Sequence, residues 1–264
     1  MLTEVRNQFK VSFLSIKYSV MRELLNKFTF VSNVVFMILN NASMIIQWVV
    51  LFSLRDNMGG YSFKEVLLLW GMASGVYGFS RFFFYKSFNL SSLINSGKLD
   101  SYIVQPKNIL ISIITSDISV SAIGDLLYGY IMLLFYGLSI KSFLLFTYFV
   151  ITGGIIIAAL SVIFNSLSFW IGNSDTISDT GNALMVNFAT YPDGIFKGIT
   201  KILLFTLIPV GISNYIPVHV IVNFDLNLFL INTCVCIFLI YFAFIIFYRG
   251  LKRYSSSNLM SSRI

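Results

Sequence analysis

The residues of this chain that could do chemistry are few, and the most suggestive are two carboxylates in an apolar stretch. Asp117 and Asp125 stand eight residues apart within residues 109–138. On one helix this spacing would place them about 80° apart around the axis. If the stretch crosses a membrane, a carboxylate there is expensive and is a candidate for function. Asp117, about two turns from one end, can be hydrated, whereas Asp125 is either a helix-packing partner or a residue on a transport pathway.

Side-chain amides in the first apolar stretch form a second pattern. Asn33, Asn40 and Gln47 recur every seven residues, so they share one face of a helix. Amides between membrane helices usually form interhelical hydrogen bonds worth about 0.6 kcal/mol on average. These residues therefore either hold helices together or line a polar track, along a route or at a subunit seam. The next apolar stretch carries a small-residue stripe that predicts close helix packing: Gly71, Gly75 and Gly78.

No catalytic or metal-binding pattern accompanies these residues. The sequence has no Gly-x-x-x-x-Gly-Lys-Ser/Thr phosphate loop and no His-Glu-x-x-His motif. Its one histidine, His219, and its two cysteines, Cys234 and Cys236, lack the spacing of a metal site or of a nucleophile with its base. We therefore expect no catalytic residue, no metal ligand and no cofactor bound by this chain.

The composition explains why polar residues are scarce. The chain has 264 residues, of which 57% are hydrophobic, 17% aromatic and 11% charged, with a mean hydropathy of +0.83. Soluble domains average about 45–50% apolar and about 25% charged residues. This excludes a soluble enzyme, a disordered chain and a secreted disulfide scaffold. The net charge of +7 does not indicate nucleic-acid binding, because no basic cluster is long enough to form a phosphate-binding face.

Hydropathy predicts an all-α integral membrane protein with six transmembrane helices in one domain, residues 1–264. Five spans are clear: residues 28–52, 66–84, 109–138, 143–169 and 226–247. Hydropathy favours an apolar segment at 195–212 as the remaining crossing, and the alternative is a more polar helix at 174–190. The second choice leaves a re-entrant outer hairpin at 191–225, which Pro192, Pro209 and Pro217 would break into short pieces.

The distribution of basic residues predicts the orientation. Thirteen lie on the side of the two termini: Arg6, Lys10, Lys17, Arg22, Lys27, Arg81, Lys86, Lys98, Lys107, Arg249, Lys252, Arg253 and Arg263. Only Arg55, Lys64 and Lys141 lie on the other side, with Lys197 and Lys201 unassigned. Because Lys and Arg favour the cytoplasmic side, both termini, including the tail 249–264, are expected in the cytoplasm.

The N-terminal arm, residues 4–26, has the pattern of an amphipathic helix. Its narrow polar stripe comprises Gln8, Ser12, Ser15, Ser19, Arg22 and Asn26, and its apolar stripe comprises Val5, Phe9, Phe13, Ile16 and Val20. Periodicity alone fits a packed soluble helix equally well. The direct junction with the first span favours a helix lying in the membrane interface.

The segment 85–108 is the longest predicted cytoplasmic loop. It contains a candidate helix at residues 90–95, followed by Gly97 as a helix stop and by Pro106 before the next span. Such a helix either connects two spans or docks the protein on a cytoplasmic motor.

The order of these features resembles the permease subunits of ABC type-2 exporters, and particular motifs indicate a small bacterial branch. The inner loop reads Gly97-x-Leu99-Asp100-x-Tyr102-x-Val104-Gln105-Pro106. The outer region contains Tyr191-Pro192, Ile208-Pro209 and Tyr215-Ile216-Pro217. The resemblance covers about residues 5–254.

This resemblance implies a half-transporter in the bacterial cytoplasmic membrane without an ATP site of its own. Two permeases, identical or related, would sit on ATP-binding subunits that hold ATP and Mg²⁺, and ATP-driven closure would export a substrate. The residues implied for coupling to the ATPase are Leu93, Gly97, Lys98, Leu99, Asp100, Gln105 and Pro106. Those implied for the outer gate are Tyr191, Pro192, Pro209, Tyr215 and Pro217.

The resemblance also favours the polar fifth helix, 174–190, on which Asp175, Asp179 and Asn182 would share a face. The candidates for the substrate path are then Asn33, Asn40, Gln47, Asp125, Asp179 and Asn182. A path of amides and hydroxyls without an ion-binding cluster suits an amphipathic drug, antimicrobial peptide or lipid-like molecule.

Two other classes of protein compete with this interpretation. In an ion-coupled secondary transporter, or a substrate-capturing subunit of an importer, Asp117 and Asp125 would be the coupling or binding acids. Paired broken helices in inverted repeats, which are typical of such transporters, are not visible in the sequence. A passive structural or assembly protein of the membrane is the other alternative.

Overall fold

The computed structural model describes residues 2–172 and 174–255, and within these it is helical without a β-sheet. The long helices are α1 (Leu2–Glu23), α2 (Lys27–Leu54), α3 (Phe63–Phe83), α7 (Ser121–Gly137), α8 (Ile140–Ser166), α10 (Asp175–Ala189) and α13 (Leu226–Leu251). The short elements are η1 (Tyr85–Asn89), α4 (Leu90–Asn95), α5 (Asp100–Ile103), α6 (Ile109–Ile114), α9 (Ser168–Ile171), η2 (Asp193–Ile195), α11 (Gly198–Thr206), η3 (Gly211–Tyr215) and α12 (Ile216–Val222). The predicted tail lies outside the described residues from residue 256 onward.

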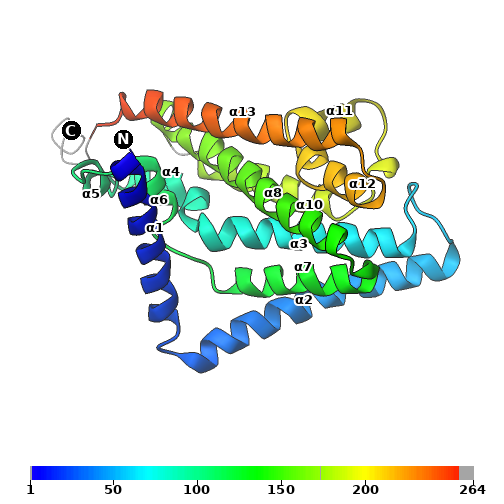
Figure 1. Ribbon diagram of the computed structural model, residues 1–264. Helices are drawn as coiled ribbons and strands as arrows, with labels where there is room; N and C mark the ends of the chain where they lie inside the picture. The colour runs from blue at the N-terminus through cyan, green and yellow to red at the C-terminus, as the bar shows by residue number, and fades with distance from the viewer. Residues whose placement is uncertain (1, 173, 256–264) are drawn as a thin grey trace.

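The long helices other than α1 run lengthwise through the molecule, and α1 crosses one end of them (Figure 1). We call this the α1 end. It also holds η1, α4, α5, α6 and the last turns of α13, whereas α11 and α12 lie at the opposite end (Figure 1). The start of α1 and the end of α13 therefore lie on the same side of the bundle.

Helix α3 is the centre of the packing. Most of its side chains are buried, and it lies against α7 and α8. A methyl group added at Gly71 would lie 2.9 Å from the carbonyl oxygen of Gly129, and one at Gly78 would lie 2.7 Å from the amide nitrogen of Leu126. Only glycine allows the backbones of α3 and α7 to approach so closely. The predicted packing role of the small-residue stripe is confirmed.

Four helices are long and apolar enough to cross a membrane: α2, α3, α8 extended through α9, and α13. Their bounds agree with the first, second, fourth and last predicted spans to within a few residues. The shorter apolar helix α7 and the more polar α10 run alongside them (Figure 1). Six crossings remain a prediction, because α7 and α10 have 17 and 15 residues, fewer than the about 20 of a full span.

The predicted continuous third span at 109–138 is wrong. Helix α6 ends at Ile114, and α7 begins only at Ser121. Side chains in between hydrogen-bond to the local backbone: Thr115 and Ser116 donate to the carbonyls of Ile111 and Ile113 at 2.8 and 2.7 Å. Such bonds compete with helix propagation, which hydropathy does not register. Asp117 lies in this break, so the predicted angle between Asp117 and Asp125 on one helix is also wrong.

The segment between α9 and α13 shows which of the two predicted fifth helices forms. It does not decide how many times the chain crosses the membrane. A helix forms at Asp175–Ala189, over the polar segment. The apolar alternative, 195–212, is not one helix, because α11 ends at Thr206 and Pro209 follows. Helix α11 and the helical segment 211–222 are bent by 77° relative to each other, a geometry that fits a broken span or a re-entrant loop.

Candidate functional site

The connection from α3 to α6 at the α1 end is anchored by buried apolar side chains. Leu90 and Ile94 of α4 and Leu99 before α5 are all buried. Gly97 stands between them with φ +71°, a left-handed conformation that ends α4 and turns the chain. Leu99, predicted to contact an ATPase, therefore anchors the loop from within.

The outer surface of this connection comes from other residues. Lys98, Gln105 and Pro106 are exposed, and Leu93 and Asp100 are partly exposed. Val104, which was not among the predicted contact residues, is 81% exposed. Val104 follows Ile103 and precedes Gln105, so the sequence offers two adjacent apolar residues in a loop as the signal that could have identified it. These residues, rather than Leu99, can reach a partner.

A chain of buried hydroxyl and amide groups joins α4 to α8, α9 and the start of α10. The amide of Ser91 donates to Oδ1 of Asn165 at 3.1 Å, and its hydroxyl lies 2.5 Å from that of Ser168. The Ser168 hydroxyl in turn lies 2.7 Å from Oγ of Ser174, the residue before α10. We call Ser91, Asn165, Ser168 and Ser174 the serine cluster. It joins α4 to the end of α8, to α9 and to the start of α10.

An ion-pair cluster ties α1 to the same region. Nη2 of Arg22 lies 2.7 Å from one carboxylate oxygen of Asp117, and Nζ of Lys86 lies 3.2 Å from the other. Burial by itself would raise the pKa of Asp117, but hydrogen bonds from Arg22, the Ile118 amide and Lys86 outweigh it and lower the pKa. Asp117 is thus an ionised structural residue, as its predicted hydrated position implied.

The polar stripe of α1 faces the protein instead of water. Gln8 accepts a hydrogen bond from the amide of Asn108 at 2.9 Å and donates to Ser112 at 3.2 Å. Oγ of Ser12 lies 3.1 Å from the hydroxyl oxygen of Thr115, within hydrogen-bond distance. Phe9 and Phe13, on the apolar stripe, are 73% and 67% exposed. The helix presents apolar side chains outward and crosses the bundle end, the arrangement expected of an interfacial helix.

The contacts of Asp125 distinguish between its two predicted roles, a helix-packing partner and a residue on a transport pathway. Asp125 is buried and accepts a hydrogen bond from Nδ2 of Asn41 at 2.7 Å, and its backbone carbonyl accepts one from Ser74 at 2.8 Å. These contacts join α2, α3 and α7, so Asp125 is a helix-packing partner. Asn41 does not belong to the predicted seven-residue pattern, and because it is 84 residues from Asp125 in the chain, no local pattern could have linked the two.

The predicted amide track on α2 lies on the outside of the described chain. Asn33, Asn40 and Gln47 are exposed, whereas the inward face of α2 carries Asn41 and the buried Trp48. They do not line a route within one chain.

The predicted polar face of α10 is divided. Asn182 is buried and accepts a hydrogen bond from Ser161 at 3.3 Å, whereas Asp179 is exposed. Asp175 is partly buried at the first turn. Asn182 therefore points into the bundle and Asp179 points away from it.

A second polar cluster lies at the opposite end and was not predicted. The hydroxyl of Tyr61 donates to Oδ1 of Asp193 at 2.8 Å. Nε2 of His219 lies 3.3 Å from the Tyr61 hydroxyl oxygen and 3.3 Å from Oδ1 of Asp193. Nζ of Lys201 lies 3.2 Å from Oδ2 of Asp193. We call these four residues the Asp193 cluster. Burial by itself would raise the pKa of Asp193, but the hydrogen bonds from His219, Tyr61 and Lys201 lower it to about 2.

The predicted outer-gate residues belong to the same hairpin, 191–225, as Asp193, Lys201 and His219. Tyr215 is fully buried and donates to the carbonyl of Phe188 at 2.6 Å, and the three prolines are buried. Tyr191 is 44% exposed and packs edge-on against Trp48 of α2. The carbonyl of Gly59 occupies the space where a side chain at residue 194 would begin, so Gly194 is required for this contact. The hairpin therefore packs closely against the loop between α2 and α3.

The described residues contain no group of three or more His, Cys, Asp or Glu that could hold a metal ion. Cys234 is exposed and Cys236 is buried, and neither forms a disulfide. The buried polar groups of the described chain join helices to one another. The described chain is thus a helical bundle with a loop anchored by buried side chains at the α1 end and a hairpin packed on the loop between α2 and α3 at the opposite end.

Comparison with known proteins identifies this body. The family model of the ABC-2 family transporter proteins matches residues 38–258, from within α2 to beyond α13. No curated protein and no solved structure matches the chain. Membership of this family implies a membrane permease that works with an ATP-binding partner. The chain belongs to the ABC-2 transporter family, as the permease subunit of an ABC transporter.

Proposed function

We propose that this permease is half of an ATP-driven exporter that moves an amphipathic molecule outward by alternating access. The serine cluster carries the proposal. Through Ser91, Asn165 and Ser174, a push on α4 from an ATP-binding subunit reaches α8 and α10 without passing through a flexible linker. Buried hydrogen bonds of this kind are expensive to leave unmade, which favours movement as one unit.

The proposed orientation places the α1 end in the cytoplasm. The basic residues of α1, η1 and the end of α13 gather there, as positively charged cytoplasmic segments do. Lys201, which the sequence left unassigned, pairs with Asp193 at the opposite end. The exposed residues Lys98, Val104 and Gln105 would then form the contact with the ATP-binding subunit.

We propose that a second permease, identical or related, covers the flank of α2 that bears Asn33, Asn40 and Gln47. These side chains are exposed along a spanning helix, with Asn40 at its middle. Amide groups left in contact with lipid are costly, whereas a neighbouring protein surface can satisfy their hydrogen bonds.

The test is ATP hydrolysis by purified protein. The chain alone is expected to hydrolyse no ATP, because the ATP and Mg²⁺ sites are proposed on the partner. Co-purification with its cognate ATP-binding subunit should give hydrolysis and ATP-dependent efflux from cells or vesicles. Hydrolysis by the lone chain, or uptake driven by an ion gradient without ATP, would contradict the proposal.

A further inference from the structure

A cavity of about 1000 Å³ lies between α1 and α6 on one side and α8 and α13 on the other. This is at the upper end of the range of about 300–1,000 Å³ that is usual for small-molecule sites. The cavity is partly open to the surface, so a ligand can enter it from outside the bundle. It lies apart from the Asp193 cluster and from the exposed amides of α2.

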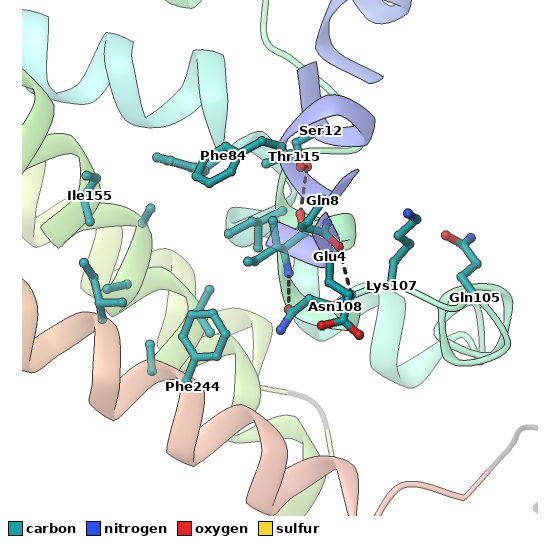
Figure 2. A pocket seen from close by; sticks show the side chains of 18 of the residues that line it. Glu4, Gln8, Ser12, Phe84, Gln105, Lys107, Asn108, Thr115, Ile155 and Phe244 are labelled. Atoms are coloured by element: carbon teal, nitrogen blue, oxygen red, sulfur yellow. Dashed lines mark hydrogen bonds between the residues drawn. The ribbon is translucent and has the colours of Figure 1, made fainter. Parts of the chain in front are cut away.

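The two sides of the cavity differ in chemistry. Figure 2 shows the polar side chains of α1 and of the loop before α6 on one side, with Glu4, Gln8 and Asn108 labelled, and Ile155 and Phe244 facing them from α8 and α13. The apolar side continues through the small residues Ala158, Ala159 and Ala243, which leave room where larger side chains would close the gap. A molecule bound here meets polar groups at one end and hydrocarbon along the rest.

The polar side is held rigid. Gln8 and Ser12 of α1 are hydrogen-bonded to α6 and to Asn108, so α1 cannot swing into the cavity without breaking these bonds. The charged residues that line the cavity are one acid, Glu4, and one base, Lys107. A head group that carries one charge of each sign, or none, matches this pair better than an anionic head group does.

The depth of the apolar side matches one leaflet of a membrane. Ile240 lies eleven residues before the end of α13, which at 1.5 Å per residue is about 16 Å from the helix end. This is about half of the hydrocarbon core, which is about 30 Å thick. An alkyl tail that enters beneath the interfacial helix α1 would therefore lie at its natural depth.

We infer that this cavity binds one membrane amphiphile, with its alkyl tail between α8 and α13 and a head group without net charge beside Glu4 and Lys107, and that it is where the exporter first holds its substrate. The second part rests on the proposed function. The first part does not, because it concerns binding to the chain alone.

The binding test uses membranes that contain the full chain and a lysophosphatidylcholine with a photoreactive diazirine in its tail. We expect label on peptides from α8 and α13 that contain Ile155 and Ile240. Unlabelled lysophosphatidylcholine should displace it at least fivefold more effectively than lysophosphatidylglycerol. Label spread evenly over all lipid-facing helices, or equal competition by the anionic lipid, would overturn the inference.

A matched pair of substitutions on α13 sharpens the test. Ile240→Trp fills the cavity, whereas Ile237→Trp adds the same bulk at a position that is 62% exposed and does not line it. Labelling should fall at least fivefold in Ile240→Trp and stay unchanged in Ile237→Trp. Ile155→Trp fills the cavity from α8 and replaces the first variant if that one does not fold. Equal labelling of the filled variants and the control would overturn the inference.

The role in transport is tested separately in the complex with the ATP-binding subunit. Lysophosphatidylcholine should stimulate ATP hydrolysis by the complex containing Ile237→Trp, and this stimulation should be lost with Ile240→Trp. Local labelling together with undiminished stimulation in Ile240→Trp would overturn the entry role. A complex that never hydrolyses ATP would instead contradict the proposed function, while the labelling result on the chain would stand.

Discussion

Asn41 donates a hydrogen bond from Nδ2 to Oδ1 of Asp125 at 2.7 Å, and this contact joins the middle of α2 to the first turns of α7. Helix α2 buries only Trp48 completely. The pair therefore matters for the attachment of the first span to the rest of the bundle.

Asn41→Leu should weaken this attachment. It removes the donor to a buried carboxylate, and leaving such a group unsatisfied costs about 1–3 kcal/mol. The unfolding of purified protein in detergent should show a lower midpoint than the wild type. Asn40→Leu, the same change one residue earlier on the exposed flank, is the control and should leave the midpoint of the isolated chain unchanged. Equal effects of both changes would contradict the assignment.

The surface of the loop between α3 and α6 should carry the contact with the ATP-binding subunit. Val104→Arg replaces an apolar side chain that is 81% exposed, so the fold should persist while co-purification and ATP hydrolysis fall at least tenfold. Ile195→Arg, at a residue 49% exposed at the opposite end, is the control and should not change either measurement. Normal hydrolysis with Val104→Arg would show that this surface is only a connection.

Leu99→Ala should behave differently from Val104→Arg. Leu99 is fully buried, and truncating a buried leucine to alanine costs about 2–5 kcal/mol. We expect lower expression and a lower unfolding midpoint, with loss of ATPase binding only as a consequence. A stable Leu99→Ala protein that fails to bind the ATPase would restore the original prediction of direct contact.

The serine cluster should transmit movement as well as stabilise the fold. Ser91→Ala removes the hydroxyl contact to Ser168, which costs about 1 kcal/mol, and should lower the amount transported per ATP hydrolysed. Ser92→Ala, an exposed neighbour on the same helix, is the control. The ratio of transport to hydrolysis in reconstituted vesicles is the measurement, and an unchanged ratio in Ser91→Ala would limit the cluster to a structural role.

Acid should weaken the Asp193 cluster. Because the pKa of Asp193 is lowered to about 2 in the folded protein, its contribution to stability is fully present above its unfolded pKa of about 4. That contribution is lost as the pH falls through about 2. The difference in melting temperature between wild type and Asp193→Asn should thus be largest at pH 5 and above and should shrink toward pH 2. Asp179→Asn, at an exposed carboxylate, is the control; a difference that is independent of pH would contradict the ion-pair origin.

The sequence by itself determined the class of the protein, because about 20 apolar residues without charge have one stable environment. Hydropathy favoured the apolar segment 195–212 over the polar helix α10, which only the family resemblance supported. The sequence predicted the bounds of α2, α3, α8 and α13 and the glycine contacts of α3. These features depend on composition and on local periodicity, which one segment carries alone.

Only the tertiary structure decided which polar groups meet. Periodicity places Asn33 and Asn40 on one face of α2, but it does not say that this face points outward while Asn41 meets Asp125. Tyr61 and Asp193 are 132 residues apart in the chain, and no local pattern links them. Leu99 lies in a motif that resembles a contact surface, yet packing turns it inward. Partners at this separation are chosen by the way that the helices pack, because a helix defines its faces but not the neighbour that each face will meet.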